Sequence, residues 1–241
     1  MGDNRKHRGQ HPADAKLFTE KTIPTIRRAV ADLEWLLSRG YPERASLKLV
    51  GDRFRLRDRQ RKAVLRAACS DQDLVRRTER QVEIEQVRDQ VLLLDGFNVL
   101  ITVESALSGG LLFESRDGCY RDLAGIHGSY KRVTETRQAI LHIGNYLKEI
   151  GAPRVFWYFD RPVSNSGRLK TMLYEVAAKE SWDWKVDLVY NPDKVLIAAS
   201  EVIVSSDSII LNQAERWFNL GRNVVDRYVP DAQIIRLAGY H

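Results

Sequence analysis

Residues Val91 to Leu100 read VLLLDGFNVL, and this stretch decides the fold because four apolar residues run directly into an aspartate. A short run that is apolar on both faces is typical of a buried strand in a parallel sheet. Asp95 falls where this strand would end, and Gly96 lets the backbone turn sharply there. Ligands of open parallel sheets bind outside the carboxyl ends of the strands, so Asp95 is a candidate site residue. The alternative is that Asp95 only caps the following helix.

The composition is that of a globular protein in water. The 241 residues allow one or two domains, with 44% hydrophobic and 29% charged residues. No apolar run approaches the roughly 18 residues of a membrane span. The basic N-terminus has no apolar segment behind it that would make a secretory signal. Cys69 and Cys119 lack zinc-type spacing, so they are expected to be free thiols in a reducing cytoplasm, in a protein with no membrane partner.

The positive charge is concentrated in the N-terminal third. Residues 1–90 hold 21 lysines and arginines against 14 aspartates and glutamates, whereas residues 91–241 hold 17 against 18. This asymmetry indicates a basic helical domain at 1–88 joined to an α/β domain at 89–241. A basic but inert helical surface is the competing interpretation.

The N-terminal third carries helical patterns and no strand pattern. After a disordered segment at 1–12, helices are expected at 14–39, 42–50 and 58–69, with Pro24 at a break or in a first turn. Residues 70–90 are expected to be a helix or a linker. An arginine-rich turn separates the second and third helices, and it suits binding to nucleic-acid phosphates. Its candidate residues are Arg53, Arg55, Arg57, Arg59 and Arg61. A solvated edge explains the same pattern equally well.

After residue 91 the pattern alternates between strands and helices. Further strands are expected at 154–160, 184–190 and 201–206. One or two final short strands are expected at 223–225 and 233–237. Helices are expected at 133–150, 168–179, 194–199 and 208–219. The glycine-rich residues 101–132 are expected to form an irregular loop. The alternation predicts an α/β domain with a mainly parallel sheet covered by helices.

Four aspartates follow predicted strands, namely Asp95, Asp160, Asp193 and Asp207. In a parallel sheet these residues lie along one edge, where their charges repel one another unless cations stand between them. Hard divalent metals prefer such oxygen ligands, so Mg²⁺ or Mn²⁺ is the expected cofactor. Metal-assisted phosphodiester hydrolysis uses this design. The competing interpretation is that each aspartate is an ordinary helix cap.

Three motifs carry a resemblance to the PIN-like nucleases, especially their NYN branch. Residues 94–99, LDGFNV, resemble the first motif, FWYFD at 156–160 resembles the second strand and its aspartate, and VSSD at 204–207 resembles the fourth-strand motif. The whole chain also resembles an uncharacterised prokaryotic family in which a helical piece precedes such a domain. The resemblance implies a three-layer α/β/α sandwich and a metal-dependent endoribonuclease, with Asp95, Asp160 and Asp207 as catalytic metal ligands.

The chain departs from this pattern at two positions. Asn212 follows Asp207 by one turn, where related sites often carry another acid. The helical acid of the superfamily has no certain counterpart. Glu104 and Glu135 are the candidates, and Glu104 is preferred as a catalytic residue for its closeness to Asp95. Asp193 is the further candidate metal ligand.

Several polar residues near these motifs are candidates for contacting substrate. Asn98 would orient Asp95 or a metal-bound water. Ser164, Asn165 and Ser166 open a helix and could hold a phosphate through their amides and hydroxyls. The remaining candidates are Ser206, His127 and Arg121. Each has a structural alternative. Asn98 would be a turn residue, and the serine-rich segment would only cap a helix. His127 would be a structural histidine, and Arg121 would lie in a solvated loop.

Two other functions compete with a nuclease that cleaves RNA. One is a nucleic-acid-binding or ribosome-associated protein whose PIN-like site is degenerate. The other is a haloacid-dehalogenase-like phosphatase, which needs a second aspartate two residues after the first, where this chain has Phe97. The sequence leaves the identity of the RNA and the oligomeric state, a homo-oligomer included, open.

Overall fold

The computed structural model describes residues 7–124, 130–152 and 154–239. The N-terminal part forms six helices, α1 (Asp14–Leu17), α2 (Ile23–Ser38), α3 (Glu43–Arg53), α4 (Asp58–Ala67), α5 (Asp71–Arg80) and α6 (Ile84–Val87). Pro24 lies in the first turn of α2, where its missing N–H is not needed. The arginine-rich segment is the end of α3, a turn and the start of α4. The helical character predicted for this part of the chain is therefore confirmed.

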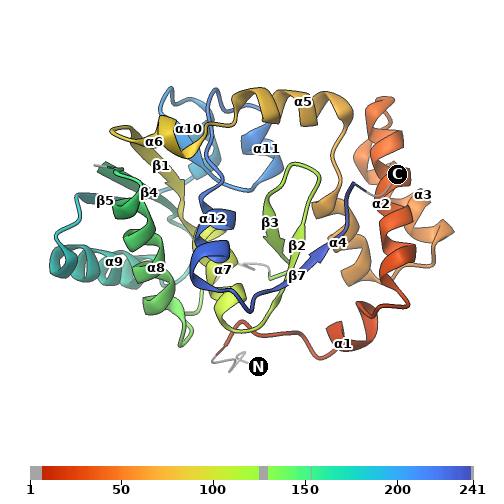
Figure 1. Cartoon of the computed structure of the whole chain (residues 1–241), viewed down its shortest axis with the longest axis horizontal. Coiled ribbons are helices and arrows are strands. Elements are labelled where there is room, and N and C mark those ends of the chain that lie inside the picture. Colours follow the sequence, from red (N-terminus) through yellow and green to blue (C-terminus); the bar gives the residue numbers. More distant parts are fainter. Residues whose placement is uncertain (1–6, 125–129, 153, 240–241) are drawn as a thin grey trace.

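A four-stranded sheet forms the centre of the second part, at the left of Figure 1. Its strands are β1 (Val91–Asp95), β4 (Arg154–Asp160), β5 (Trp184–Val189) and β6 (Val202–Val204). They stand in the order β5-β4-β1-β6, and all three pairings are parallel. The parallel sheet predicted from the alternation of strands and helices is confirmed.

Helices cover both faces of this sheet. One face packs against α7 (Gly96–Leu107), α8 (Thr136–Glu149), α9 (Ser166–Glu180) and α12 (Leu220–Tyr228). The other face packs against α10 (Pro192–Ile197) and α11 (Ser208–Leu211). Leu92 and Leu94 of β1 belong to the first core and Leu93 to the second, because successive side chains of a strand point to opposite faces. The result is a three-layer α/β/α sandwich.

Gly96 is required by packing. It does not adopt a positive φ, so conformational freedom does not explain it. A Cβ atom at this position would stand 2.4 Å from the ring of Phe159 on β4. The start of α7 therefore lies directly against the neighbouring strand, which fixes Asp95 at the junction.

Three sequence-based expectations about elements are wrong. Residues 101–132 are not one irregular loop, because α7 continues to Leu107 and is followed by two antiparallel strands, β2 (Leu111–Glu114) and β3 (Tyr120–Asp122). Residues 223–225 lie within α12 and form no strand. The helix expected at 208–219 is the single turn of α11.

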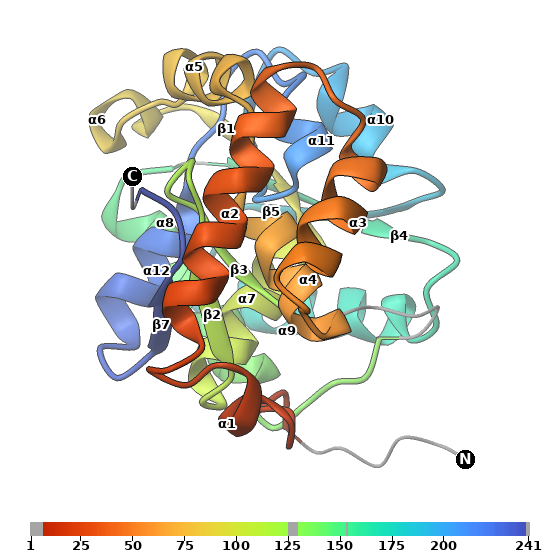
Figure 2. The ribbon, with the colours of Figure 1, turned by 90° about the vertical axis from the view of Figure 1, so that its right-hand side faces the viewer.

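The two parts of the chain share a hydrophobic core. Strand β7 (Gln233–Arg236) pairs with β2, so β3, β2 and β7 form a second sheet that lies between α7 and the N-terminal helices (Figure 1). Phe113, Leu123 and Leu237 pack with buried residues of α2 and α4, such as Leu33 and Val64. Figure 2 shows α2 and α4 in front of this second sheet.

The N-terminal segment is held against the α/β part. Residues 1–6 of the segment expected to be disordered lie outside the described residues. The expectation is wrong for the remainder, because Arg8 forms an ion pair with Glu104 of α7 and His11 accepts and donates hydrogen bonds at the start of α1. Among the described residues, no helix combines the length and the apolar character needed to cross a membrane.

Candidate functional site

Three aspartates stand at the carboxyl edge of the parallel sheet. Asp95 is the last residue of β1, and Asp160 is the last residue of the adjacent strand β4. On the other side of β1, Asp207 follows β6 after two serines. The sheet order β4-β1-β6 therefore places the three residues around the end of the central strand. This is the edge at which open α/β sheets bind their ligands.

Asp95 has the most perturbed carboxyl group of this edge. Its pKa is raised to about 7, mainly because the carboxyl group is buried, and the negative charges of Asp207 and Asp193 add to the rise. The Ser205 hydroxyl donates a hydrogen bond of 2.7 Å to Asp95 Oδ2, which lowers the pKa in part. Strongly perturbed groups of this kind cluster at functional sites.

The other three aspartates are coupled to one another in the same way. Burial raises the pKa of Asp193, which lies in the first turn of α10, and the charge of Asp207 raises it further. Burial also raises the pKa of Asp160, and Asp193 adds to that rise. Asp95, Asp160, Asp193 and Asp207 are therefore one electrostatic group, called here the strand-end cluster.

Asp207 has a second role as a helix cap. Its Oδ1 accepts hydrogen bonds from the backbone N–H groups of Ile209 and Ile210 at the start of α11, at 2.8 and 3.4 Å. The capping interpretation thus holds for Asp207. A cap uses one carboxylate oxygen, so it does not remove Asp207 from the cluster.

Asn98 and Ser205 fix the loop that carries Asp207. Asn98 Oδ1 accepts hydrogen bonds from the backbone N–H and from the hydroxyl of Ser206, at 2.8 and 2.9 Å. Ser205 Oγ accepts a hydrogen bond of 3.0 Å from the backbone N–H of Asp207 and donates to Asp95. Asn98 and Ser206 were expected to contact substrate. In the structure they bind each other, and so join the start of α7 to the loop after β6.

Arg121 on β3 also binds the loop before Asp207. Its Nε donates a hydrogen bond of 2.7 Å to the Ser206 carbonyl, and its other nitrogens bind Asp117. Arg77 of α5 binds the same Asp117 carboxylate at 2.6 Å and donates to Asn212 Oδ1 at 2.7 Å. Arg121 was expected to clamp substrate phosphate. It lies buried in this ion network instead, where it positions the loop before Asp207.

Glu104 does not join the strand-end cluster. It lies nine residues beyond Asp95 in α7, which is about 13 Å along the helix axis. Its buried carboxylate binds Arg8, the hydroxyl of Tyr130 and the hydroxyl of Thr136. The expected proximity to Asp95 is wrong because the segment is a helix and not a loop. Glu135, the other candidate, pairs with His7.

The serine-rich loop after β4 opens a helix as predicted. Asn165 is the N-cap of α9, with φ 70°, and Ser166 is its first residue. The Ser164 carbonyl and the Asn165 side chain both bond the backbone of Tyr130, at 3.1 and 2.9 Å. Phosphate binding at this loop stays a prediction. His127 lies outside the described residues.

The predicted nucleic-acid-binding arginines are largely paired with carboxylates. Arg53 binds Asp32 at 3.1 Å, Arg59 binds Asp14 at 2.7 Å, and Arg61 binds Asp52 at 2.7 Å. The exposed Arg55 and Arg57 occupy the turn between α3 and α4. The arginine-rich turn therefore holds fewer uncompensated charges than its sequence indicates.

A hollow of about 390 Å³ adjoins the strand-end cluster. Asn98, Ser206 and Asp207 line one side, and Glu43, Leu65 and Arg66 of the N-terminal helices line the other. No motif in the sequence marks Glu43, Leu65 or Arg66 as site residues. They are far from the motifs in sequence, and the packing of α4 against β2, with α3 packed on α4, brings them there.

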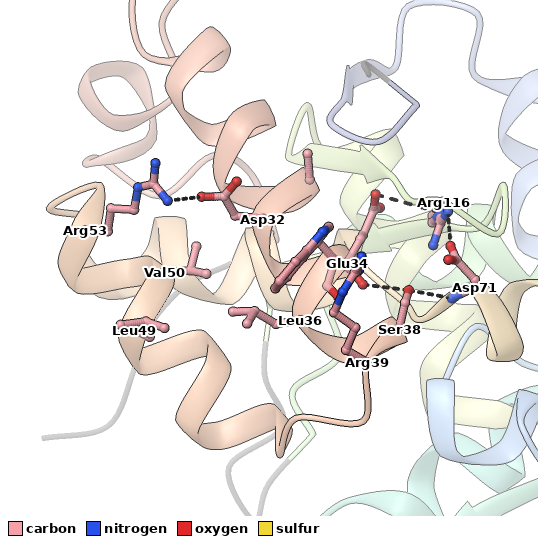
Figure 3. A pocket seen from close by; sticks show the side chains of 12 residues that line it. Asp32, Glu34, Leu36, Ser38, Arg39, Leu49, Val50, Arg53, Asp71 and Arg116 are labelled. Carbon is pink, nitrogen blue, oxygen red and sulfur yellow. Dashed lines mark hydrogen bonds and ion pairs between the residues drawn. The ribbon is translucent and has the colours of Figure 1, made fainter.

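Another hollow lies elsewhere. It has a volume of about 720 Å³ between α2, α3 and the start of α5, and it shares no residue with the strand-end cluster (Figure 3). The buried Glu34 stands at its base beside Arg116, which also binds Asp71 at 2.6 Å. Arg116 stands beside two carboxylates of this hollow, Glu34 and Asp71, so a counter-charge is already present there.

The strand-end cluster suits one kind of metal ion. Its donors are carboxylate oxygens, which hard divalent cations prefer. Within residues 7–124, 130–152 and 154–239, no three His, Cys, Asp or Glu side chains form a group that could hold a metal ion. Mg²⁺, however, is usually bound through one or two carboxylates and completes its shell with water and substrate phosphates. Asp95 and Asp207 are therefore as many carboxylates as such an ion usually takes from protein.

Comparisons with known proteins match both parts of the chain. A family described as a protein of unknown function (DUF434) matches residues 25–80. The chain is also similar to the uncharacterized protein MJ0935 of Methanocaldococcus jannaschii, with 29% identity over 187 residues that cover 78% of this chain and 89% of the relative. No solved structure matches.

A second family, described as a domain of unknown function (DUF5616), matches residues 84–223, which include all of the strand-end cluster. The expected resemblance to an uncharacterised family with a helical piece ahead of an α/β domain is confirmed by the two matches, and neither description names a nuclease. Because the second match covers more than half of the 241 residues, the chain belongs to the DUF5616 family.

Proposed function

We propose that this protein is a PIN-like, NYN-type nuclease that hydrolyses the phosphodiester bonds of RNA with the help of Mg²⁺ or Mn²⁺. The observation that carries the proposal is the strand-end cluster, in which a half-buried Asp95 with a pKa of about 7 stands near the charges of Asp207 and Asp193. Carboxylates that repel one another at a ligand-binding edge favour a divalent cation between them.

The cation and the protein have separate tasks in this proposal. When bound, a divalent cation supplies Lewis-acid polarisation of the phosphodiester and lowers the pKa of a water, so no protein nucleophile is needed. Asp95 and Asp207 would hold it, with Asp160 or Asp193 binding water at its periphery. The Ser205 hydroxyl orients Asp95, and Asn98 holds the Ser206 backbone so that Asp207 stays beside Asp95.

The first prediction concerns Asp95→Asn. The amide keeps the shape of the side chain but removes its charge, so cleavage of a mixed RNA pool in Mn²⁺ should fall by about 100-fold or more, the scale of one lost electrostatic contact to a transition state. Circular dichroism should show an unchanged fold. The control is Asp187→Asn, an exposed aspartate of the same sheet on β5, which should cleave as the unchanged protein does.

Calorimetry with Mn²⁺ tests the metal without relying on activity. The double substitution Asp95→Asn/Asp207→Asn should abolish the binding heat, and asparagine at 207 can still cap α11. Equal Mn²⁺ affinity in the double variant and the unchanged protein would show that these carboxylates are not ligands.

A non-catalytic protein that binds nucleic acid is the second candidate function. The specific observation in its favour is that, in the part of the chain that the structure describes, no three-ligand metal group forms at the sheet edge. In this case the protein would bind RNA equally well with Asp95 or Asn at position 95, and no cleavage would follow the addition of Mn²⁺.

A further inference from the structure

A basic trough leads away from the strand-end cluster. The hollow beside Asp207 shares Leu65, Arg66, Asp122 and Ala124 with a second hollow of about 470 Å³. The two hollows therefore adjoin each other, and they lie between α4 on one side and α7 with β3 on the other. We call them together the trough.

The trough is formed only by the docking of the two parts of the chain. Arg66 on α4 donates a hydrogen bond to the Asp122 carbonyl at the end of β3, where the two hollows meet. Leu65 of the same helix lines both of them. The N-terminal segment lines the far end, where His7, Arg8 and His11 border the second hollow.

The charge changes along the trough. Near the cluster the lining has three carboxylates, Asp207, Glu43 and Asp122, against Arg66 and the buried Arg121. The far hollow is lined by basic side chains, Arg8, Arg59, Lys62, Arg66 and Lys131, against Asp14 and Asp122. Arg8, Arg59 and Arg66 are paired with Glu104, Asp14 and Asp122. Among the described residues, no carboxylate lies within ion-pair distance of Lys62 or Lys131, so these two lysines give the trough its excess positive charge.

We propose that a single RNA strand runs from the strand-end cluster along the trough, with its backbone phosphates bound by Lys62 and Lys131. The inference rests on the proposed nuclease function, since it takes the cluster as the place of cleavage. A positively charged groove that follows the backbone is how proteins bind single strands without sequence preference. Each hollow has the size of a small-molecule pocket, so it admits the nucleotides of one strand and not a duplex.

The experiment measures RNA binding apart from cleavage. Full-length protein carrying Asp95→Asn is titrated into a fluorescein-labelled single-stranded RNA at several salt concentrations, and anisotropy gives the affinity. Adding Lys62→Ala/Lys131→Ala should weaken binding several-fold at low salt. The slope of log affinity against log salt should fall by about 1.4, because each phosphate contact to a single strand contributes about 0.7.

Two further variants decide where the strand lies. Lys148→Ala/Lys179→Ala removes the same charge from exposed positions on α8 and α9 and should leave affinity and slope unchanged. Arg55→Ala/Arg57→Ala tests the arginine-rich turn, and a loss of affinity there with none in the trough variant would overturn the proposal. Tighter binding of a hairpin duplex than of the single strand would overturn it as well.

Failure of the path and failure of the nuclease give different results. If Lys62→Ala/Lys131→Ala weakens RNA binding but protein with Asp95 intact shows no Mn²⁺-dependent cleavage, the trough remains a binding path and the nuclease proposal fails. If Asp95→Asn abolishes cleavage while Lys62→Ala/Lys131→Ala changes neither cleavage nor RNA binding, the nuclease proposal stands and the proposed path of the strand is wrong.

Discussion

Glu34 is a buried carboxyl group that the proposed chemistry does not use. It stands at the base of the hollow between α2 and α3, beside Arg116 and Asp71 (Figure 3). Burial raises its pKa to about 7, the Arg116 charge opposes the rise, and the Asp71 charge adds to it. Between about pH 4.5 and 7, the folded state therefore keeps a proton that the unfolded chain has lost.

The second prediction follows from the sign of this shift. Stability from Glu34 is fully present below the unfolded pKa of about 4.5 and is lost as the pH rises through about 7. A shift of this size corresponds to about 3 kcal/mol at most. Glu34→Gln should flatten the dependence of the free energy of unfolding on pH between 5 and 8, as measured by urea denaturation. An equally steep loss in the variant would assign the dependence to other groups.

The third prediction compares two glycines that each lie in the first turn of a helix. A methyl group at Gly96 meets the Phe159 ring at 2.4 Å, whereas one at Gly167 in α9 meets no atom within 4 Å. Gly96→Ala should lower the free energy of unfolding by about 1–3 kcal/mol through overpacking. Gly167→Ala should raise it by up to about 1 kcal/mol, because alanine is the better helix former. Equal effects in thermal denaturation would contradict the packing role of Gly96.

At the level of elements, the loop from β6 to α11 is fixed by a buried ion network. Asp117, in the turn between β2 and β3, binds both Arg121 and Arg77. Burial by itself raises the pKa of Asp117, but the two guanidinium groups outweigh it and hold the pKa well below its usual range. Arg121 then binds the Ser206 carbonyl. A hairpin that sequence analysis took for a loop thus supports the residue before Asp207.

The fourth prediction is that Asp117→Asn destabilises the fold by about 3–5 kcal/mol, because it leaves two buried cations without a counter-charge. The control is Asp183→Asn, which breaks the exposed ion pair with Arg154 and should cost about 1 kcal/mol or less. Chemical denaturation measures both. A cost near zero for Asp117→Asn would show that the network is dispensable for stability.

The elements that could be predicted from sequence are those with a local signal. The apolar runs ending in Asp95 and Asp160 predicted two parallel strands and their common edge, because burial on both faces leaves a continuous apolar pattern. Strands β2 and β3 were missed because they are three or four residues long and lie among glycines. Residues 223–225 were misread because a short apolar pair fits a strand as well as the buried face of α12.

Site residues, too, could be predicted only where a local sequence signal marks them. Asp95, Asp160 and Asp207 could be found because each ends a strand, and strand ends in a parallel sheet meet. Glu104 was misplaced because its position depended on the element assigned to residues 101–132. Arg66 and Glu43 carry no local signal, since their approach to the cluster depends on how α3 and α4 dock.

For the whole molecule, the central question is how the N-terminal helices relate to the α/β part. The family matches at 25–80 and 84–223 divide the chain near residue 80, close to the change in charge and pattern near residue 88. The packing runs across that division, since one core holds Leu33 and Val64 together with Phe113 and Leu237. The second sheet is thus covered by α2 and α4, and the trough exists only while the two parts are docked.

The last prediction is that this shared core makes the two parts unfold together. Leu33 of α2 is fully buried, so Leu33→Ala should cost about 2–5 kcal/mol by leaving a cavity. Peptide-resolved hydrogen exchange in the variant should speed up in β1 and β4 as well as in α2, because a cooperative unit opens as a whole. Leu49→Ala on α3 is the matched control, since that side chain is 61% exposed and its loss should change stability by no more than about 0.5 kcal/mol. Faster exchange confined to α2, α3 and α4 would mean that the helices open as a separate unit and that the trough can open without unfolding the sheet. Faster exchange in both parts would mean that the acidic edge and the basic trough persist or vanish together.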